Sequence, residues 1–281
     1  MADHDQTWWP APAKINLFLH VLGRRPDGYH DIQTLFQLLD WGDEIGIRVL
    51  SNPGISRLPV SYGVPEPEDL VTRAARLLQA EADVRLGAEI AVRKKVPPGS
   101  GLGGGSSDAA TVLLVLNRLW NCGLGHDDLS RLGRSLGADV PVFIRGRSAL
   151  AMATGDKLQS CSLGLRHYVL VFPDFPIATR ELFEDPDLKR DSRLLTLQEI
   201  LSGSGRNDFE PLVRKRFPVF DETMRILQKW GKPVMTGTGS GIFIPMRDKK
   251  SAKSAARAIK SLYNVRAVQG VDLSPLHEKL D

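Results

Sequence analysis

A glycine-rich segment at residues 97–107 contains the residue types that most clearly indicate chemistry in this sequence. Its residues are Pro97, Pro98, Gly99, Ser100, Gly101, Leu102, Gly103, Gly104, Gly105, Ser106 and Ser107. Glycines allow positive φ angles and a close approach of the backbone to a bulky anion. Asp108 and a long apolar run follow, so free N–H groups at a helix start would face the same space. The segment predicts a loop that binds nucleotide phosphates.

Two familiar phosphate loops do not fit this segment. The Walker A pattern requires Gly-Lys followed by Ser or Thr, and that is absent. Gly99, Gly101 and Gly104 match the dinucleotide pattern GxGxxG, but residues 94–98 separate them from the strand-like run 88–93. A Rossmann unit also needs an acid that ends a second strand about 20 residues later. A flexible Gly/Ser linker is the remaining alternative, although a linker rarely lies between a strand and a long apolar helix.

Phosphoryl transfer to an alcohol needs more than a phosphate loop. It requires charge neutralisation, a metal on the phosphate oxygens and a group that orients or deprotonates the hydroxyl. Either Ser106 or Ser107 is a candidate for reaching the metal or the β-phosphate. Asp139 lies between small residues where a helix is expected to give way to a strand, and Lys14 lies in a strand beside Asn16. The alternatives are a turn or cap aspartate and a solvated lysine.

Four segments, in order along the chain, resemble the GHMP kinase superfamily. They are Pro12-Ala13-Lys14-Ile15-Asn16-Leu17, Arg25-Pro26-Asp27-Gly28-Tyr29-His30, the loop with Asp108-Ala109-Ala110, and Gly237-Thr238-Gly239-Ser240-Gly241. The segments around Lys14 and His30 narrow the resemblance to the branch whose substrate is a CDP-linked methylerythritol. The implied activity is ATP-dependent phosphorylation of the 2-hydroxyl of that small molecule, a step of non-mevalonate isoprenoid precursor biosynthesis.

The resemblance also implies roles for individual residues. Lys14 and Asp139 match the catalytic pair, in which the aspartate takes or orients the hydroxyl proton and the lysine offsets charge. Residues 97–107 would hold the triphosphate of ATP, with Mg²⁺ as the bridging ion and no separate protein metal site. The matching substrate contacts are Asn16, Tyr29 and His30, with Phe183 and Thr179 as further candidates, for which a core aromatic and a helix-cap threonine are the alternatives. Tyr29 and Phe183 are expected to stack on cytosine, and His30 to bond its edge.

Asp69 departs from the family pattern, because many members have asparagine before the matching helix. An ionised carboxylate cannot donate to a purine edge as an amide does. The sequence therefore gives no adenine contact at Asp69, and this residue is left outside the predicted site.

Strands and helices mix without regular alternation, which favours an α+β fold. We expect strands at 12–21, 35–39, 43–49, 88–93, 168–172, 242–244 and 265–269. We expect helices at 69–82, 106–120, 127–136, 179–184, 194–203, 219–230 and 250–262. The resemblance implies two domains: an ATP-binding and catalytic domain at 1–158 with a ribosomal-protein fold, and a ferredoxin-like domain at 159–281.

Composition limits the other classes of function. The chain has 281 residues, 42% of them hydrophobic, and a net charge of +4 spread along the sequence. No concentrated basic stripe supports an RNA-binding module, and no apolar run is long enough to span a membrane. The first residues lack signal-peptide character and the two cysteines are far apart, so we expect a cytoplasmic protein. Monomer and weak homodimer stay open, as does a kinase for another alcohol such as homoserine.

Overall fold

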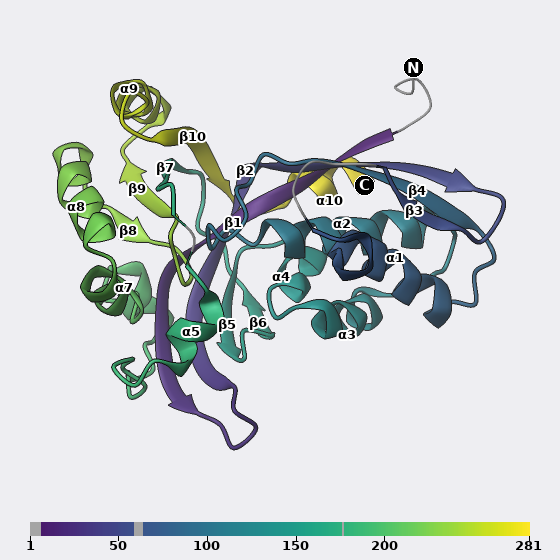
Figure 1. Ribbon diagram of the computed structural model, residues 1–281, viewed down its shortest axis with the longest axis horizontal. Coiled ribbons are helices and arrows are strands. Elements are labelled where there is room, and N and C mark those ends of the chain that lie inside the picture. Colours follow the sequence, from purple (N-terminus) through teal and green to yellow (C-terminus); the bar gives the residue numbers. More distant parts are fainter. Residues whose placement is uncertain (1–6, 59–63, 176) are drawn as a thin grey trace.

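Two long strands run through the whole molecule. β1 (Thr7–Arg24) and β2 (His30–Leu50) pair antiparallel, and their hairpin projects at the lower end of the view in Figure 1. Both strands are rich in β-branched, leucine and aromatic residues, which suit a sheet buried on its faces. The computed structural model describes residues 7–58, 64–175 and 177–281. The other helices and strands of the described residues are arranged around the β1–β2 pair.

The strands of the described residues form one mixed, ten-stranded sheet. Pairing is antiparallel throughout except between β3 and β4. β2 pairs with β1, β4, β5 and β10, and the order continues from β10 through β7 and β9 to β8. The further strands are β3 (Ile55–Arg57), β4 (Gly87–Arg93), β5 (Ala149–Ala153), β6 (Lys157–Ser160), β7 (Arg166–Phe172), β8 (Val234–Met235), β9 (Ile242–Met246) and β10 (Asn264–Val271).

The helices divide into two groups on this sheet (Figure 1). The first group is α1 (Leu70–Glu81), α2 (Gly104–Leu119), α3 (His126–Leu136) and α4 (Val140–Arg145). The second group is α5 (Thr179–Glu184), α6 (Leu197–Leu201), α7 (Glu210–Arg216), α8 (Pro218–Leu227) and α9 (Lys249–Ile259), and α10 (Pro275–Leu280) follows β10. Short 3₁₀ turns are at Glu66–Glu68 and Gln228–Trp230. Among the described residues, no helix combines the length and apolar character that a membrane crossing requires. This mixture confirms the α+β fold.

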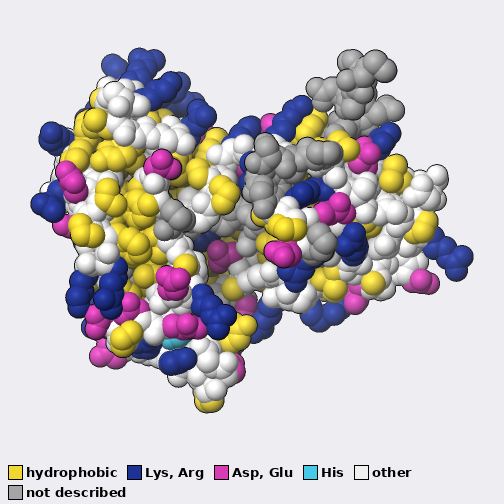
Figure 2. Space-filling view, in the orientation of Figure 1, with side chains coloured by type: hydrophobic (Ala, Val, Ile, Leu, Met, Phe, Trp, Pro, Cys, Tyr) yellow, Lys and Arg dark blue, Asp and Glu magenta, His cyan; other side chains and the backbone are white. Residues whose placement is uncertain are grey.

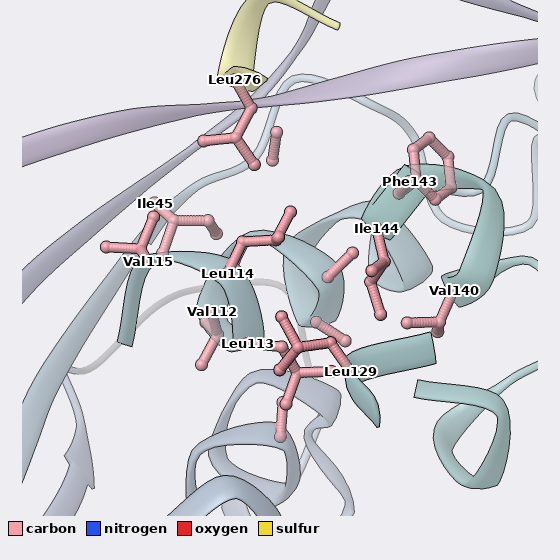
Figure 3. Packing of buried hydrophobic residues seen from close by; sticks show 14 of the residues in the cluster. Ile45, Val112, Leu113, Leu114, Val115, Leu129, Val140, Phe143, Ile144 and Leu276 are labelled. Atoms are coloured by element: carbon pink, nitrogen blue, oxygen red, sulfur yellow. The ribbon is translucent and has the colours of Figure 1, made fainter. Parts of the chain in front are cut away.

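Helix α2 is the centre of the first core. Every residue from Ser107 to Leu116 is buried, because α1, α3, α4 and the sheet surround this part of the helix. Figure 3 shows Val112, Leu113, Leu114 and Val115 among side chains of α3, α4, β2 and α10. Each such fully buried apolar side chain contributes about 1.5–3 kcal/mol. The packing fixes the start of α2, and with it the end of the glycine loop.

A second core joins the far ends of β1 and β2 to the rest of the chain. Leu19 and Val21 of β1 pack with buried residues of β7, β9, α7, α8 and α9. The last helix, α10, packs on the first core and not on the second. Its Leu276 belongs to the first core, and Lys279 Nζ donates to the Trp8 carbonyl at 2.6 Å. The space-filling view shows a hollow between the two parts of the molecule (Figure 2). The boundary at residue 158 stays a prediction.

The expected strands at 35–39 and 43–49 are one continuous strand. Gly42 lies between the two expected ranges, within β2. A Cβ at Gly42 would lie 2.0 Å from the Ala11 carbonyl oxygen, so the glycine lets β1 and β2 cross closely. The register between the strands shifts directly afterwards, between Pro12 and Lys14. Such irregularities often redirect a side chain beside a functional site.

Two other expectations were wrong in detail. Asp139 is followed by helix α4 and not by a strand, because Pro141 is compatible with the first helical turn. The helix expected at 194–203 covers only Leu197–Leu201. Thr196 starts it with a capping box, and Gly203, at φ +87°, follows its end.

Candidate active site

The glycine-rich loop lines a cavity of about 430 Å³. Gly99, Gly101 and Gly103 have φ between +69° and +73°, a region in which residues other than glycine are strained. Gly103 is the N-cap of α2, so the free N–H groups of that helix start at the cavity wall. Residues 97–106 all line the cavity, together with Asp69, Lys94 and Asp108. This geometry suits an anion such as a triphosphate.

The second glycine cluster, at 237–241, packs directly on this loop. The Ser240 N–H donates to the Gly99 carbonyl at 3.3 Å. A Cβ at Gly101 would lie 2.4 Å from the Thr236 carbonyl oxygen, so a side chain at Gly101 would force the two loops apart. The two glycine-rich segments, far apart in sequence, therefore form one structural unit.

Lys14 connects β1 to the loop through both its backbone and its side chain. Its N–H donates to the Leu102 carbonyl at 3.0 Å, and its ammonium donates to the Gly101 carbonyl at 3.0 Å. The same ammonium donates to Asn16 Oδ1 at 2.7 Å and lies 3.1 Å from Asp139 Oδ2. Only 3% of Lys14 is exposed, so the solvated-lysine alternative is wrong.

Asp139 occupies the N-cap position of α4, but its carboxylate does not cap the helix. The side chain of Asp139 is 31% exposed, whereas that of its partner Lys14 is 4% exposed. The carboxylate is thus held by an ammonium from the buried side and keeps an accessible side. A carboxylate with this environment is available to accept a proton from an incoming hydroxyl.

Two threonines that the sequence did not single out orient Asn16. The Asn16 amide donates to Thr34 Oγ1 at 2.8 Å, and the Asn16 N–H donates to Thr236 Oγ1 at 2.9 Å. Because Asn16 Oδ1 accepts from Lys14, the orientation of the amide group is determined. Thr236 precedes the second glycine cluster, which was the available signal; Thr34 had no signal of its own.

Ser106 and Ser107, the two candidates for reaching the metal or the β-phosphate, have different surroundings in the structure. Ser107 is fully buried, and its hydroxyl donates to the Pro12 carbonyl at 2.6 Å. Ser106 lines the cavity, and a Cβ placed on Gly137 would lie 3.5 Å from its hydroxyl oxygen. Ser106 therefore faces the segment that carries Asp139, whereas Ser107 fastens α2 to β1.

Three ionisable residues, Asp43, Lys94 and Asp108, contact one another beside the glycine-rich loop. Lys94 Nζ donates to Asp43 Oδ2 at 2.5 Å and to Asp108 Oδ2 at 2.8 Å. Asp43 also accepts the N–H groups of Lys95 and Val96, where the chain enters the loop. Burial, opposed by Lys94 and assisted by the charge of Asp43, raises the pKa of Asp108 to about 8. Asp108 Oδ1 is buried and has no hydrogen-bond partner among the described residues.

The predicted substrate residues form a second group. Tyr29 is 67% exposed in the β1–β2 turn, whereas His30 is buried with its ring centroid 5.0 Å from that of Phe183. Thr179 Oγ1 lies 2.8 Å from Thr238 Oγ1, in the second glycine cluster. His30 and Phe36, the partner of Asn16, are six residues apart on β2, or about 20 Å along the strand at about 3.3 Å per residue.

Asp69 has a structural task. It caps α1 by accepting the Val71 N–H at 2.9 Å, and it pairs with Arg57. It lines the cavity as a buried side chain, and its carboxylate is already engaged.

A larger cavity, of about 570 Å³, lies elsewhere, between β7, β9 and the segment before α7. None of the predicted site residues lines it. Of the predicted site residues, those of the loop at 97–106 line the smaller cavity, and Lys14 contacts that loop through the Gly101 carbonyl.

Known proteins resemble the chain over its whole length. The model of the GHMP kinases N terminal domain matches residues 69–147, and that of the GHMP kinases C terminal domain matches residues 185–265. A 4-diphosphocytidyl-2-C-methyl-D-erythritol kinase from Xanthomonas euvesicatoria pv. vesicatoria is 48% identical over 279 residues, which cover 99% of this chain and 95% of that protein. The kinase of the same name from Halorhodospira halophila is 46% identical and covers 96% and 94%.

Solved structures give the same picture. The crystal structure of a 4-(cytidine 5'-diphospho)-2C-methyl-D-erythritol kinase superposes with a TM-score of 0.83 at 32% identity, covering 94% of this chain and 100% of that one. A homoserine kinase from Cytophaga hutchinsonii has a TM-score of 0.68 at 17% identity, covering 98% and 97%. At that identity the second likeness shows the fold alone.

Proposed function

The chain belongs to the 4-diphosphocytidyl-2-C-methyl-D-erythritol kinases, within the GHMP kinase family, and we propose that Lys14 and Asp139 perform its phosphoryl transfer. It is an ATP-dependent kinase that phosphorylates the 2-hydroxyl of the CDP-linked methylerythritol. The observation that carries the assignment is the 3.1 Å ion pair between Lys14 and Asp139, beside the glycine loop. The partner in this proposal is a small molecule; neither nucleic acid nor a membrane takes part.

The roles follow from the geometry of the pair. Asp139, with its accessible side, accepts or orients the proton of the attacking hydroxyl. Lys14 donates to the Gly101 carbonyl, so its charge lies against the loop that holds the phosphates. The ammonium can thus offset negative charge on the phosphoryl group as it moves. The backbone N–H groups of residues 99–105 hold the triphosphate in line with the acceptor.

Mg²⁺ fits the donor set at the loop. Mg²⁺ in kinases is bound by one or two carboxylates, phosphate oxygens and water, and no all-protein cage is needed. Among the described residues there is no cluster of three or more His, Cys, Asp or Glu side chains that could hold a metal. Ser106, which lines the loop cavity, would hold the ion together with the phosphates and water, where the ion would neutralise phosphate charge. Ser107 is excluded because its hydroxyl is buried and bonded.

The far end of the β1–β2 ribbon is proposed to bind the cytosine. Tyr29 and Phe183 offer aromatic faces, and His30 offers a ring nitrogen. The distance of about 20 Å along β2 between His30 and the position opposite Asn16 requires an elongated substrate. A nucleobase joined through a diphosphate to a four-carbon polyol has that form, and homoserine does not. Thr179 is proposed as a further polar contact of the substrate, supported by its position beside Thr238 of the second glycine cluster, 2.8 Å between the two hydroxyl oxygens.

The activity is tested by supplying purified protein with ATP and Mg²⁺ and measuring ADP with alternative acceptors. We expect ADP formation with 4-diphosphocytidyl-2-C-methylerythritol and background rates with homoserine or mevalonate. Turnover of homoserine at the higher kcat/KM would contradict the proposed substrate. A phosphorylated product at a hydroxyl other than the 2-hydroxyl, identified by NMR, would contradict the proposed position of attack.

A further inference from the structure

Arg190 joins His30 to the segment that carries Phe183. It lies in the connection between α5 and α6, and its Nε donates to His30 Nε2 at 3.0 Å. Its other nitrogens donate to three carbonyls: those of Leu188 at 3.0 Å, Phe183 at 2.9 Å and Asp185 at 2.8 Å. Four hydrogen bonds therefore hold the guanidinium in one place, and the guanidinium in turn holds the ring of His30.

The contact determines where the proton of His30 is. An arginine guanidinium has only donors and keeps its proton in proteins, so His30 Nε2 must accept with its lone pair. A neutral imidazole with an unprotonated Nε2 carries its hydrogen on Nδ1. Among the described residues, the His30 Nδ1 atom has no hydrogen-bond partner, and it is not fully buried. It is a donor that is open to a ligand.

The charges around His30 act in the same direction. Burial lowers the pKa of His30, and the positive charges of Arg190 and Arg24 lower it further. Phe183, the other group packed on the ring, carries no charge. The doubly protonated ring, which would have to turn one N–H toward the guanidinium, is therefore disfavoured.

We infer that Arg190 is a positioning residue for base recognition: it fixes His30 as a donor through Nδ1, and so selects cytosine over uracil. The inference rests on the proposed placement of cytosine beside His30. The N3 atom of cytosine is an acceptor and matches a donor, whereas N3 of uracil carries a hydrogen and opposes it. An imidazole free to exchange its proton between nitrogens could serve either base. Arg190 removes that freedom.

The proton position is measured directly by ¹⁵N NMR of the histidine side chains in the unliganded protein, with a His30→Asn spectrum to assign the signal. At pH 7 we expect a protonated Nδ1 and an unprotonated Nε2 for His30. A hydrogen on Nε2, or a doubly protonated ring at pH 7, would overturn the inference. This measurement needs no turnover.

The selectivity is measured with CDP and UDP as ligands, by calorimetric titration in the presence of ATP analogue and Mg²⁺. We expect Arg190→Met to weaken CDP binding and to lower the CDP-to-UDP preference by about tenfold, the value of roughly one hydrogen bond. Arg190→Lys keeps a cation and a donor, and is expected to recover part of the preference. Arg193→Met is the matched control, because Arg193 pairs with Glu199 on the same connection and does not touch His30.

The outcomes separate this inference from the proposed function. If the wild-type protein phosphorylates the CDP-linked substrate but Arg190→Met keeps the CDP-to-UDP preference, only the role of Arg190 is wrong. A purely structural role would weaken CDP and UDP equally, and that result would also overturn the inference. If the wild-type protein has no activity on the CDP-linked substrate, the proposed substrate fails whatever the state of His30.

Discussion

Lys14 and Asp139 form an ion pair at 3.1 Å in which the two partners differ in exposure, 4% for the lysine side chain and 31% for the aspartate. The buried partner is held by three oxygen atoms: Asn16 Oδ1, the Gly101 carbonyl and the carboxylate itself. The ammonium cannot leave without breaking all three contacts. The carboxylate, by contrast, presents an accessible side to the substrate. Lys14 is therefore a positive charge held in one position, and Asp139 is a carboxylate that can accept a proton from the substrate.

The pair is expected to act as one unit. Lys14→Met and Asp139→Asn should each reduce kcat by about 10²–10⁴-fold. Groups that act together give strongly non-additive losses, so the double variant should be little slower than the worse single variant. Steady-state rates of ADP formation for the four proteins measure this. Multiplied losses in the double variant would show that the two residues act independently.

Ser106 and Ser107 are expected to give opposite results. Ser107→Ala removes a buried hydrogen bond to the Pro12 carbonyl and should cost about 1–2 kcal/mol of stability, with kcat retained. Ser106→Ala should leave the melting temperature unchanged and raise the Mg²⁺ concentration needed for half-maximal rate. Thermal melts and Mg²⁺ titrations of both variants provide the comparison. A Mg²⁺ shift in the Ser107 variant alone would reverse our assignment.

Gly99 and Gly101 provide a matched pair of substitutions in the loop. Both have φ near +70°, so alanine should cost about 1–2 kcal/mol at either position through backbone strain. A Cβ added at Gly101 would also lie 2.4 Å from the Thr236 carbonyl oxygen, whereas a Cβ added at Gly99 would have no atom within 4 Å. Gly101→Ala should therefore be more destabilising by about 1–3 kcal/mol and should raise KM for ATP. Equal melting temperatures would contradict the close packing of the two glycine segments.

Asp108 makes stability depend on pH in a predictable direction. Its pKa is raised to about 8 in the folded protein, chiefly by burial, and lies near 4 in an unfolded chain. Between these values the folded protein binds more protons, so stability falls as the pH rises from about 4 to about 8. Lys94 has a raised pKa too, and its contribution is lost only above pH 10.5.

The variant Asp108→Asn stays neutral and should lose much of this slope, becoming more stable than wild type at pH 8–9. Melting temperatures at pH 5, 6, 7, 8 and 9 test this. Asp127→Asn is a control of the same kind, because its side chain is 87% exposed. Parallel curves for wild type and Asp108→Asn would refute the shared burial of Asp43, Lys94 and Asp108.

Local patterns predicted most of the elements and the glycine loop. The periodicity of 69–82 and the apolar run after Asp108 both mark helices that the structure contains, α1 and α2. The break expected between 35–39 and 43–49 is absent, because Gly42 lets β1 and β2 cross closely there, and this crossing depends on the partner strand. The strand expected after Asp139 is helix α4, and the proline in its first turn, Pro141, is compatible with either element.

The contacts within the site could not be predicted from spacing. Lys14 and Asn16 share a strand face, which the alternation indicated, but their contacts to Gly101 and Thr236 join segments 87 and 220 residues apart. Whether Ser106 or Ser107 faces the cavity depends on how α2 is rotated against β1. Arg190 had no motif, because its function depends on three carbonyls and one imidazole that only the folded chain brings together.

The central claim is that Asp139 handles the proton of the acceptor hydroxyl and does not bind the nucleotide. The most direct test measures, for Asp139→Asn beside the exposed control Asp127→Asn, both ATP affinity by calorimetry and single-turnover phosphorylation of 4-diphosphocytidyl-2-C-methylerythritol. We predict nucleotide affinity within about twofold of wild type and phosphorylation slowed by at least about 10²-fold, with the control unchanged. Phosphorylation at the wild-type rate in Asp139→Asn would contradict the account.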